Sequence, residues 1–214
     1  MKKLTIIVLV LLLALALTAC NRAEADKPDA SLSTKTGVLI EASGSSINIQ
    51  APDGTTYTFG IDAHTVIQGS ENLGDTLEVN FLGDYTAGIT ATSIKTLTQA
   101  DTSAVHDDGT PVRGTTDHPD APKPANPPPA GEKMNYFAGI VTEFSSTSIS
   151  VYFEDGNVYT LKIDPNAIID PGITEHCKVR VFHTGSLKNG IVTKEINLIE
   201  GAPPTLVTGN TGPG

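Results

Sequence analysis

The stretch that decides the fold of this chain occurs twice, as SINIQAPDGTTYTFGID at Ser46–Asp62 and as SISVYFEDGNVYTLKID at Ser148–Asp164. Both lie within longer copies, Gly37–Leu97 and Gly139–Ile199, which a constant offset of 102 positions superimposes without a gap at 17 identities in 61 positions. Internal repetition determines architecture before any single motif does. The chain is therefore predicted to contain two domains of the same fold.

Each copy is predicted to contain a central β-hairpin. Apolar residues alternate with polar ones on both sides of Asp53-Gly54, and the pattern recurs around Asp155-Gly156. A period of two places the apolar residues on one face of a strand, and Asp-Gly supplies the positive φ angles of a tight turn. The dipeptide therefore marks the turn of the hairpin.

One further strand before the hairpin and two after it give five short strands in each copy. Such a set suits a small barrel, because closure removes the exposed edges of a flat sheet. We predict an all-β chain with two tandem five-stranded barrels, at residues 36–99 and 135–200. Residues 62–68 and 164–169 have room for one short helical turn.

The last strand of each copy carries a pattern that a regular strand does not accommodate. Its repeated residues Ile89 and Ile94 are five positions apart, and an odd spacing places two side chains on opposite faces. We expect a bulge or a strand end between them.

Residues 1–20 have the features of a secretion signal. Lys2-Lys3 precede the apolar run Leu4–Leu17, and Leu17-Thr18-Ala19-Cys20 closes the segment. This closing sequence resembles the lipobox of bacterial lipoproteins, and the resemblance implies that Cys20 carries a diacylglyceryl group and becomes the new N-terminus. The alternative is an uncleaved membrane anchor, but the run is shorter than the ~20 residues that a spanning helix needs.

The lipoprotein resemblance implies that the chain is held to a membrane by its lipid and lies outside the cytoplasm. Asn21 in place of Asp implies the outer membrane if the source is Gram-negative. Residues 21–35 are polar with balanced charges and are predicted to form a flexible tether.

Between the copies, residues 100–134 hold seven of the 14 prolines and few apolar residues beyond Val105 and Val112. Such a segment buries too little surface to offset its ordering entropy. We therefore predict a disordered linker that leaves the two barrels independent of each other. The tail at 201–214 is predicted to be disordered for the same reason.

The charge excludes one function that small barrels often perform. Without Lys2 and Lys3 the chain holds 12 basic against 24 acidic residues, and the first barrel is the more acidic of the two. Barrels that bind nucleic acid use a basic groove with stacking aromatics, so binding of nucleic acid is not expected. Simple solubility explains the acidic surface, which also permits a basic partner or a divalent cation.

The candidates for chemistry are Cys177, His176 and His183. A neighbouring imidazolium would activate a thiol, and the three residue types suit zinc. Adjacent strand residues point to opposite faces, however, and His183 replaces Phe81 on the face that carries Val179 and Val181. We therefore interpret His183 as a barrel-end or core residue, and we assign neither a catalytic residue, nor a metal site, nor a cofactor.

The acidic residues that repeat outside the hairpin turn are Glu41 and Asp62, which match Glu143 and Asp164. Asp62 follows the third strand, and its carboxylate is predicted to cap the turn that comes next.

The first copy resembles small extracytoplasmic bacterial domains of unknown function in Gly37–Glu41, Ser46–Ile49, Asp53-Gly54, Tyr57, Asp62, Leu73–Val79 and Ile94. The resemblance implies barrels of the oligonucleotide/oligosaccharide-binding or SH3-like type, often found in tandem in lipoproteins. The second copy lacks the Leu-Gly-Asp turn at Glu175–Lys178, so the match is closer for the first barrel.

Two functions follow as hypotheses. The first is a membrane-anchored, non-catalytic binding or scaffolding module whose partner is an envelope protein or polysaccharide. The alternative is a metal-binding or thiol-dependent protein that uses Cys177, His176 and His183.

Overall fold

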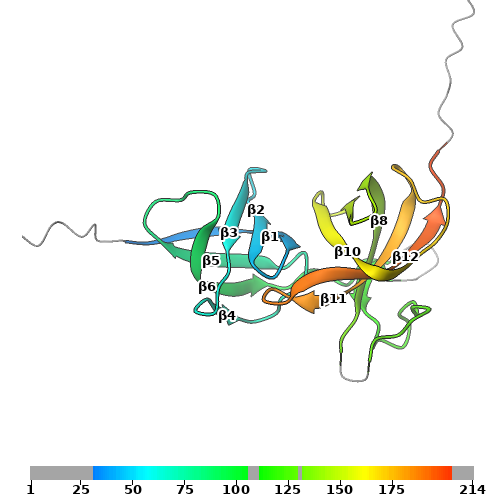
Figure 1. Cartoon of the computed structure of the whole chain (residues 1–214), viewed down its shortest axis with the longest axis horizontal. Helices are drawn as coiled ribbons and strands as arrows, with labels where there is room; N and C mark the ends of the chain where they lie inside the picture. The colour runs from blue at the N-terminus through cyan, green and yellow to red at the C-terminus, as the bar shows by residue number, and fades with distance from the viewer. Residues whose placement is uncertain (1–30, 106–110, 130–131, 204–214) are drawn as a thin grey trace, which may run out of the picture. The chain divides into compact units, whose positions relative to one another are not determined.

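The computed structural model describes residues 31–105, 111–129 and 132–203, and those from Leu32 onward belong to one compact unit. Every regular element in these residues is a β-strand, so the predicted all-β class is confirmed (Figure 1). The strands of the first copy are β1 (Leu32–Ala42), β2 (Ser46–Gln50), β3 (Thr56–Gly60), β4 (Val66–Gln68), β5 (Thr76–Leu82) and β6 (Ile89–Thr98). Those that follow are β7 (Arg113–Thr115), β8 (Asn135–Phe144), β9 (Ser148–Tyr152), β10 (Val158–Ile169), β11 (Lys178–Ser186) and β12 (Gly190–Glu200).

Five strands of the first copy close into a barrel. β1 pairs with β2 and β5, β2 pairs with β3, β5 pairs with β6, and a parallel pair between β3 and β6 completes the ring. β4 continues along the same edge of β6 in parallel register. The segment that had room for a helical turn thus holds a backbone turn and a short strand.

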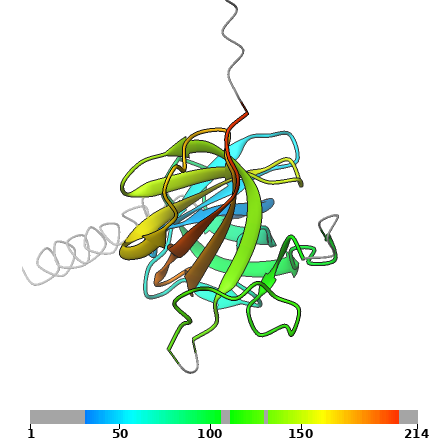
Figure 2. The same ribbon diagram turned by 90° about the vertical axis from the view of Figure 1, so that its right-hand side faces the viewer.

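The second copy closes in the same way. β8 pairs with β9 and β11, β9 pairs with β10, β11 pairs with β12, and the parallel pair of β10 with β12 closes the ring. Figure 2 shows these strands curving around one another. Both barrels therefore have their third and fifth core strands side by side and parallel, which confirms two small five-stranded barrels.

The predicted hairpin turns are present in both copies. Gly54 and Gly156 have φ angles of 84° and 88°, a region that residues with a Cβ rarely adopt. The Asp53 carboxylate accepts a hydrogen bond from the Thr55 N–H at 2.9 Å, as Asp155 does from Asn157 at 3.0 Å. The Asp-Gly pair thus fixes both the turn and the register of the hairpin.

The expected bulge lies in the last strand of each barrel. The register of β5 against β6 shifts between Asn80 and Phe81, which leaves Thr92 as the extra residue, and β12 has its extra residue at Lys194. The bulge turns Ala91 and Ile94 to the same side, where both are buried. It thereby reconciles the odd spacing with a continuous core.

The structure differs from the expected linker in two described parts of residues 100–134. β7 pairs with Asn135–Phe137 at the start of β8, before the residues of β8 that pair with β9, and Val112 and Ala121 are buried. The N–H of Ala125 donates to Glu195 at 2.8 Å. Backbone pairing and a few buried side chains thus order a segment whose composition alone favours a coil. The first barrel also starts earlier than predicted, because β1 begins inside the expected tether.

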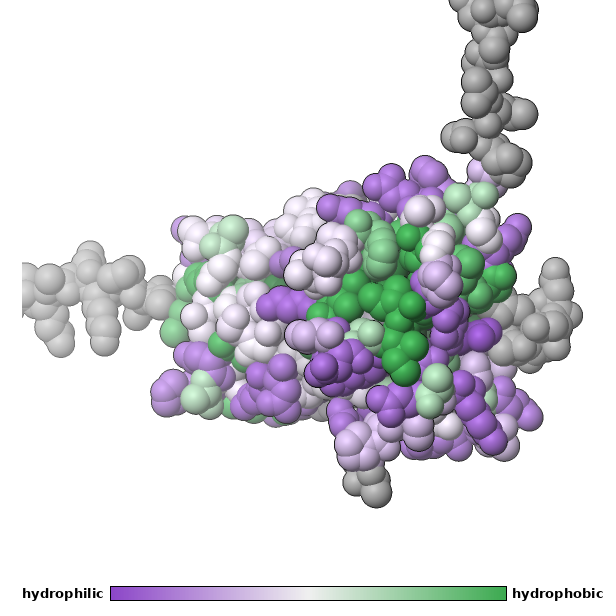
Figure 3. Space-filling model, turned by 45° about the vertical axis from the view of Figure 1, so that its right-hand side comes forward, coloured by the Kyte–Doolittle hydropathy of each residue, from purple (hydrophilic) through white to green (hydrophobic). Residues whose placement is uncertain are grey.

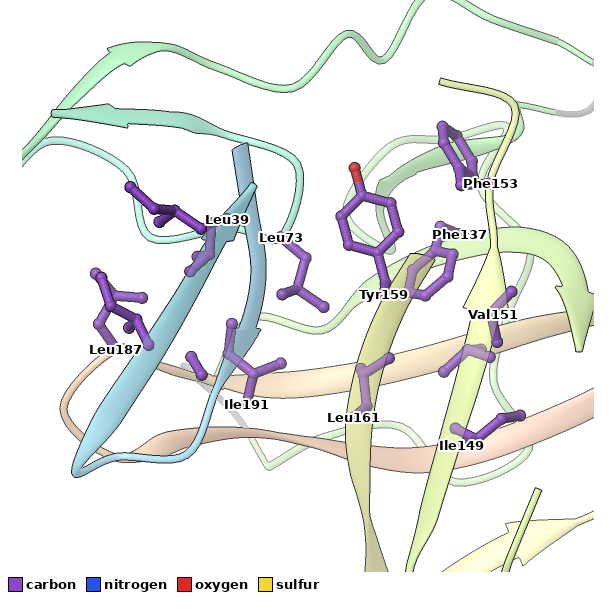
Figure 4. Close-up of a cluster of buried hydrophobic side chains, with 14 of the residues drawn as sticks. Leu39, Leu73, Phe137, Ile149, Val151, Phe153, Tyr159, Leu161, Leu187 and Ile191 are labelled. Atoms are coloured by element: carbon purple, nitrogen blue, oxygen red, sulfur yellow. The ribbon is translucent and has the colours of Figure 1, made fainter. Parts of the chain in front are cut away.

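The two barrels are not independent, because one continuous hydrophobic cluster includes the cores of both. Figure 4 shows Leu39 and Leu73 of the first copy near Leu187 and Ile191 of the second. The N–H of Leu187 donates to the Glu71 carboxylate at 2.8 Å. The turn between β11 and β12 therefore packs on the first barrel and joins the two copies.

Candidate ligand-binding cavity

The predicted thiol candidate lies in the turn before β11. Cys177 is 1% exposed, and its sulfur accepts a hydrogen bond from the Thr174 N–H at 3.4 Å. The adjacent His176 has a φ angle of 68°, so it occupies the left-handed region. Its N–H donates to the Val141 carbonyl at 2.8 Å.

The first copy explains this geometry. Gly74, the counterpart of His176, has a φ angle of 89° and donates to the Leu39 carbonyl at 2.9 Å. The carboxylate of Asp75, the counterpart of Cys177, accepts the Asn72 N–H at 2.9 Å as the sulfur accepts that of Thr174. Cys177 and His176 therefore occupy the positions of a shared turn.

His183 lies in the core of the second barrel, as interpreted from its strand face. It is 4% exposed, and its ring centroid is 5.8 Å from that of Phe137. Burial, together with the positive charge of Arg113, lowers the pKa of His183 to about 3, so the imidazole is neutral. It lies six positions after Cys177 in the chain, roughly 20 Å along a strand.

The structure thus does not bring His183 together with the Cys177–His176 turn. Among the described residues, no group of three or more His, Cys, Asp and Glu side chains is placed to hold a metal ion.

The residue that sequence reasoning missed is Arg113, which lies in β7 within the predicted linker. Its side chain is 8% exposed. The guanidinium carbon lies 4.1 Å from the ring centroid of Phe153, 4.9 Å from that of Tyr159 and 6.0 Å from that of Phe137. A cation over aromatic faces is attracted by their quadrupoles, so the three rings hold the guanidinium at the end of the second barrel.

Arg113 also contacts the first barrel. A Cβ placed on Gly74 would lie 2.2 Å from Nη1 of Arg113, so the guanidinium fits against this turn because the turn has no side chain there. The signal in the sequence is slight: Val112 and Arg113 precede a glycine in an otherwise polar, proline-rich segment.

A cavity of about 190 Å³ lies beside Arg113. Its wall comes from the loop before β5, from β7 and from the neighbouring strands β8 and β11, and its polar residues include Asn72, Asp75, Arg113, Asn135, Tyr136 and His183. Asn135 Nδ2 donates to Asn72 Oδ1 at 3.0 Å across the cavity wall. Both barrels and the segment between them therefore build one site.

The polar groups around this cavity are unevenly satisfied. Nη2 of Arg113 is buried and has no hydrogen-bond partner among the described residues. Nη1 lies 3.7 Å from the Asp155 carboxylate, which also accepts the Tyr159 hydroxyl. A buried, charged donor without an acceptor is costly, and the aromatic rings around the guanidinium offset part of that cost.

The repeated carboxylates accept hydrogen bonds in the turns and, in the case of Glu41, between two strands. Asp62 accepts hydrogen bonds from the N–H groups of His64 at 2.8 Å and Thr65 at 3.0 Å, so the predicted turn cap is confirmed. Those bonds lower the pKa of Asp62. Asp164 accepts the Asn166 N–H and forms an ion pair of 2.7 Å with Lys194. Glu41 accepts a hydrogen bond from Asn48.

The surface carries apolar side chains as well. Ile140, Tyr152 and Val158 are directly paired across β8, β9 and β10 and are all at least 36% exposed. Figure 3 shows hydrophobic residues gathered among hydrophilic ones on one face.

Cys20, the lipidation candidate, lies outside the described residues together with the whole segment 1–30. Within the described ranges no helix is long and apolar enough to cross a membrane. Neither a protein-family model nor a curated protein sequence matches this chain.

Proposed function

We propose that this chain is a lipid-anchored, extracytoplasmic bacterial lipoprotein that acts as a non-catalytic binding module. The observation that carries the binding role is the cavity to which both barrels and β7 contribute, with Arg113 among the residues that line it. Concave sites with a few convergent polar groups are where proteins bind small ligands. The envelope location rests on the lipobox resemblance at Leu17–Cys20.

In this proposal the N-terminal segment anchors the chain and the two barrels bind the partner. The acyl chains on Cys20 hold the chain at the membrane, the outer membrane if the source is Gram-negative, and the polar residues that follow separate the barrels from the surface. The two barrels act as one body rather than as two avidity-linked modules, because they share a core. The partner is an envelope component, and nucleic acid is excluded by the acidic charge.

The anchoring part is tested by expressing the full chain in a bacterial host. The expected result is an acylated N-terminal peptide beginning at Cys20, seen by mass spectrometry, and recovery with the membrane fraction. Cys20→Ala should abolish both. An unmodified Cys20 in a processed chain would contradict the proposal.

The binding part is tested with residues 20–214 carrying Cys20→Ser, which keeps every described residue. We expect fractions of an envelope extract to shift ¹⁵N-HSQC resonances around the cavity, and Arg113→Gln to remove those shifts. Shifts confined to surfaces remote from the cavity would place the binding function elsewhere.

A further inference from the structure

We infer that two molecules of this chain associate through the start of β1, with Leu32–Thr36 of one molecule paired antiparallel to Leu32–Thr36 of the other. This inference goes beyond the proposed function, because these residues do not line the cavity beside Arg113. The edge that they form is open in the first barrel, and its counterpart in the second barrel already holds a strand.

The start of β1 pairs on one side only. Its residues up to Val38 pair with β5, whereas its pairing with β2 begins at Val38. Among the residues that the structure describes, no strand pairs with the other side of Leu32–Thr36. Figure 1 shows this start of β1, in blue, at the end of the first barrel away from the second. Such an edge offers a row of backbone groups to a further strand.

The direction of these backbone groups follows from the register of β1. The N–H of Leu39 donates to the Asp75 carbonyl at 2.9 Å, on the side of β5. Neighbouring residues of a strand direct their N–H and C=O groups to opposite sides. The backbone groups that point away from β5 therefore belong to three residues that are all exposed, Leu32, Thr34 and Thr36.

The second barrel shows what this edge accepts. At the offset of 102 positions the counterpart of Leu32–Thr36 is 134–138, and β7 pairs with it in antiparallel register. There the N–H of Ala138, the counterpart of Thr36, donates to the Val112 carbonyl at 2.9 Å. A barrel of this fold thus takes up a sixth strand at this edge without losing its closure.

The sequence of the open edge resembles that of the strand which covers its counterpart. The covering residues 112–116 read VRGTT and residues 32–36 read LSTKT, so each begins with an apolar residue, contains one cation and ends in Thr. A second molecule can therefore place its β1 on the first barrel as β7 is placed on the second. Pairing of identical surfaces about a twofold axis is the commonest way in which chains form dimers.

An antiparallel pair of two such edges is centred on Thr34. Thr34 then faces Thr34 of the partner molecule and Leu32 faces Thr36, so each facing pair exchanges two backbone hydrogen bonds. Lys35 faces Ser33, which keeps the two cations from lying opposite each other. Cross-strand Thr pairs are favourable, so the side chains support the same register.

Charge acts on this pairing in two ways. A lysine on an edge strand often prevents pairing, but Nζ of Lys35 lies over the Tyr57 ring of its own barrel, 4.6 Å from the centroid. The net negative charge of the chain opposes association of two molecules. Salt screens this repulsion, so the dimer should become tighter at higher ionic strength.

A partner strand also has space to leave the edge next to Gly37, where β2 takes over as the neighbour of β1. A cavity of about 470 Å³ opens there between Thr36, Pro52 and the hairpin turn at Asp155-Gly156. Because the paired segment is short, we expect a weak dimer with a Kd of about 10–100 µM.

The first experiment measures the mass of the chain in solution. Residues 20–214 with Cys20→Ser are followed by sedimentation velocity from about tenfold below to about tenfold above the expected Kd. We expect a concentration-dependent change from monomer to dimer, with a lower Kd at about 0.5 M than at about 0.05 M NaCl.

Two substitutions of Thr34 separate its backbone from its side chain. Thr34→Pro removes the central N–H on the open side, a place where an edge strand tolerates proline, so the variant should fold and stay monomeric. Thr34→Val keeps the N–H and should dimerise with a Kd within about fivefold of the wild type. The unfolding midpoint of each variant is measured to confirm its fold.

Cross-linking tests the register. In the predicted pair the Cα atoms of the two Thr34 residues are about 5.5 Å apart, a distance that a disulfide spans. Thr34→Cys should therefore form a covalent dimer with oxidised glutathione. Thr36→Cys is the matched control, because Thr36 faces Leu32 and the two new thiols would lie roughly 13 Å apart along the strands. Cys177 is 1% exposed, so it does not compete.

The inference is overturned if the chain stays monomeric up to about 1 mM, which would leave the edge to a strand of another protein. It is also overturned if folded Thr34→Pro dimerises like the wild type, or if Thr36→Cys cross-links as fast as Thr34→Cys. If Thr34→Pro does not fold, the cross-linking comparison decides alone. These measurements use neither the cavity nor the lipid, so the proposed function is tested separately.

Discussion

The two barrels have the same backbone fold but differ in the side chains that cover their ends. The parallel strand pairs that close the barrels, the Asp-Gly turns and the bulge in the last strand recur at the same offset. The end of the first barrel is covered by Tyr85, whose ring lies 4.9 Å from Tyr57 and 5.5 Å from Phe59. In the second copy Leu187 stands at the position of Tyr85 and packs on the neighbouring barrel instead.

That difference shows where the copies have specialised. With no ring at position 187, the aromatic residues Phe137, Phe153 and Tyr159 are covered by Arg113, and the counterpart of Phe81 is His183. Repeated residues therefore maintain the barrel. The substituted ones build the cavity and the contact that Leu187 makes with the first barrel, which we call the joint. Changing residues at these divergent positions tests this interpretation.

The largest effect is expected at the joint. Leu187→Ala removes a fully buried side chain that comes from the second barrel and packs on the first. Such truncations cost about 2–5 kcal/mol of unfolding free energy. We expect both barrels to lose stability together in urea unfolding followed by resonances from each. Leu82→Ala, at a leucine that is 50% exposed, is the control and should change little. Loss of stability in the second barrel alone would contradict a shared core.

A second prediction concerns acid stability and His183. Its folded pKa of about 3 lies below the ordinary 6.5, so the unfolded state binds the extra proton. Stability from this group is complete above pH 6.5, falls by ~1.4 kcal/mol per pH unit as the pH decreases towards 3, and levels off below. His183→Phe, which installs the residue of the first copy, should remove this slope.

The measurement for His183 is the free energy of unfolding of both proteins between pH 7 and pH 4. Carboxylates bind protons in this pH range in both proteins, so the difference between the two curves is the quantity to compare. Parallel curves would mean that His183 is protonated in the folded state.

The barrels were predictable because their signals are local or repeated. Alternation around Asp53-Gly54 identified the hairpin, and the odd spacing of Ile89 and Ile94 identified the bulge. Asp62 capped its turn as expected from its place after a strand. Each of these depends on neighbours in sequence, which is why a pattern reveals it.

The joint and the cavity were not predictable, because they depend on contacts between distant residues. The composition of residues 100–134 favours a coil, but the first residues of β8, which do not pair with β9, offer hydrogen bonds that no linker composition reveals. Arg113 meets Gly74 and Phe153 only once both barrels are in place. Of the polar residues that line the cavity, the sequence singled out His183, and it did so as a core residue.

A third, smaller effect is expected at Thr193, the counterpart of Ala91. Thr193 is fully buried, and its hydroxyl has no hydrogen-bond partner among the described residues. Thr193→Val keeps the shape and removes the unsatisfied group, so it should raise the free energy of unfolding by about 1 kcal/mol.

Thr65→Val is the matched control for Thr193. The Thr65 hydroxyl donates to the Ala91 carbonyl at 2.8 Å and accepts the Asp62 N–H at 3.1 Å. The same substitution should therefore destabilise by about 1–3 kcal/mol. The change in unfolding free energy of both variants is measured in thermal or urea unfolding. If both variants were stabilised, or both destabilised, the difference between an unsatisfied and a satisfied hydroxyl would be contradicted.

The smallest effect is expected at Cys177, where the copies differ in chemistry but not in geometry. The Thr174 N–H donates to the sulfur as Asn72 does to the Asp75 carboxylate, and the N–H of Ala202, the counterpart of Ala100, also faces the sulfur. Cys177→Asp gives these N–H groups the acceptor of the first copy, so the unfolding midpoint at pH 7 should stay close to that of the wild type. Cys177→Leu, which fills the space but accepts no hydrogen bond, should lower it more, because it leaves the N–H of Thr174 unsatisfied. The thiol is buried, so a thiol reagent should modify Cys177 far more slowly in the native protein than in urea. If Cys177→Asp unfolds the second barrel while Cys177→Leu does not, packing alone holds the turn. The two turns would then share their backbone conformation but not their side-chain hydrogen bonds.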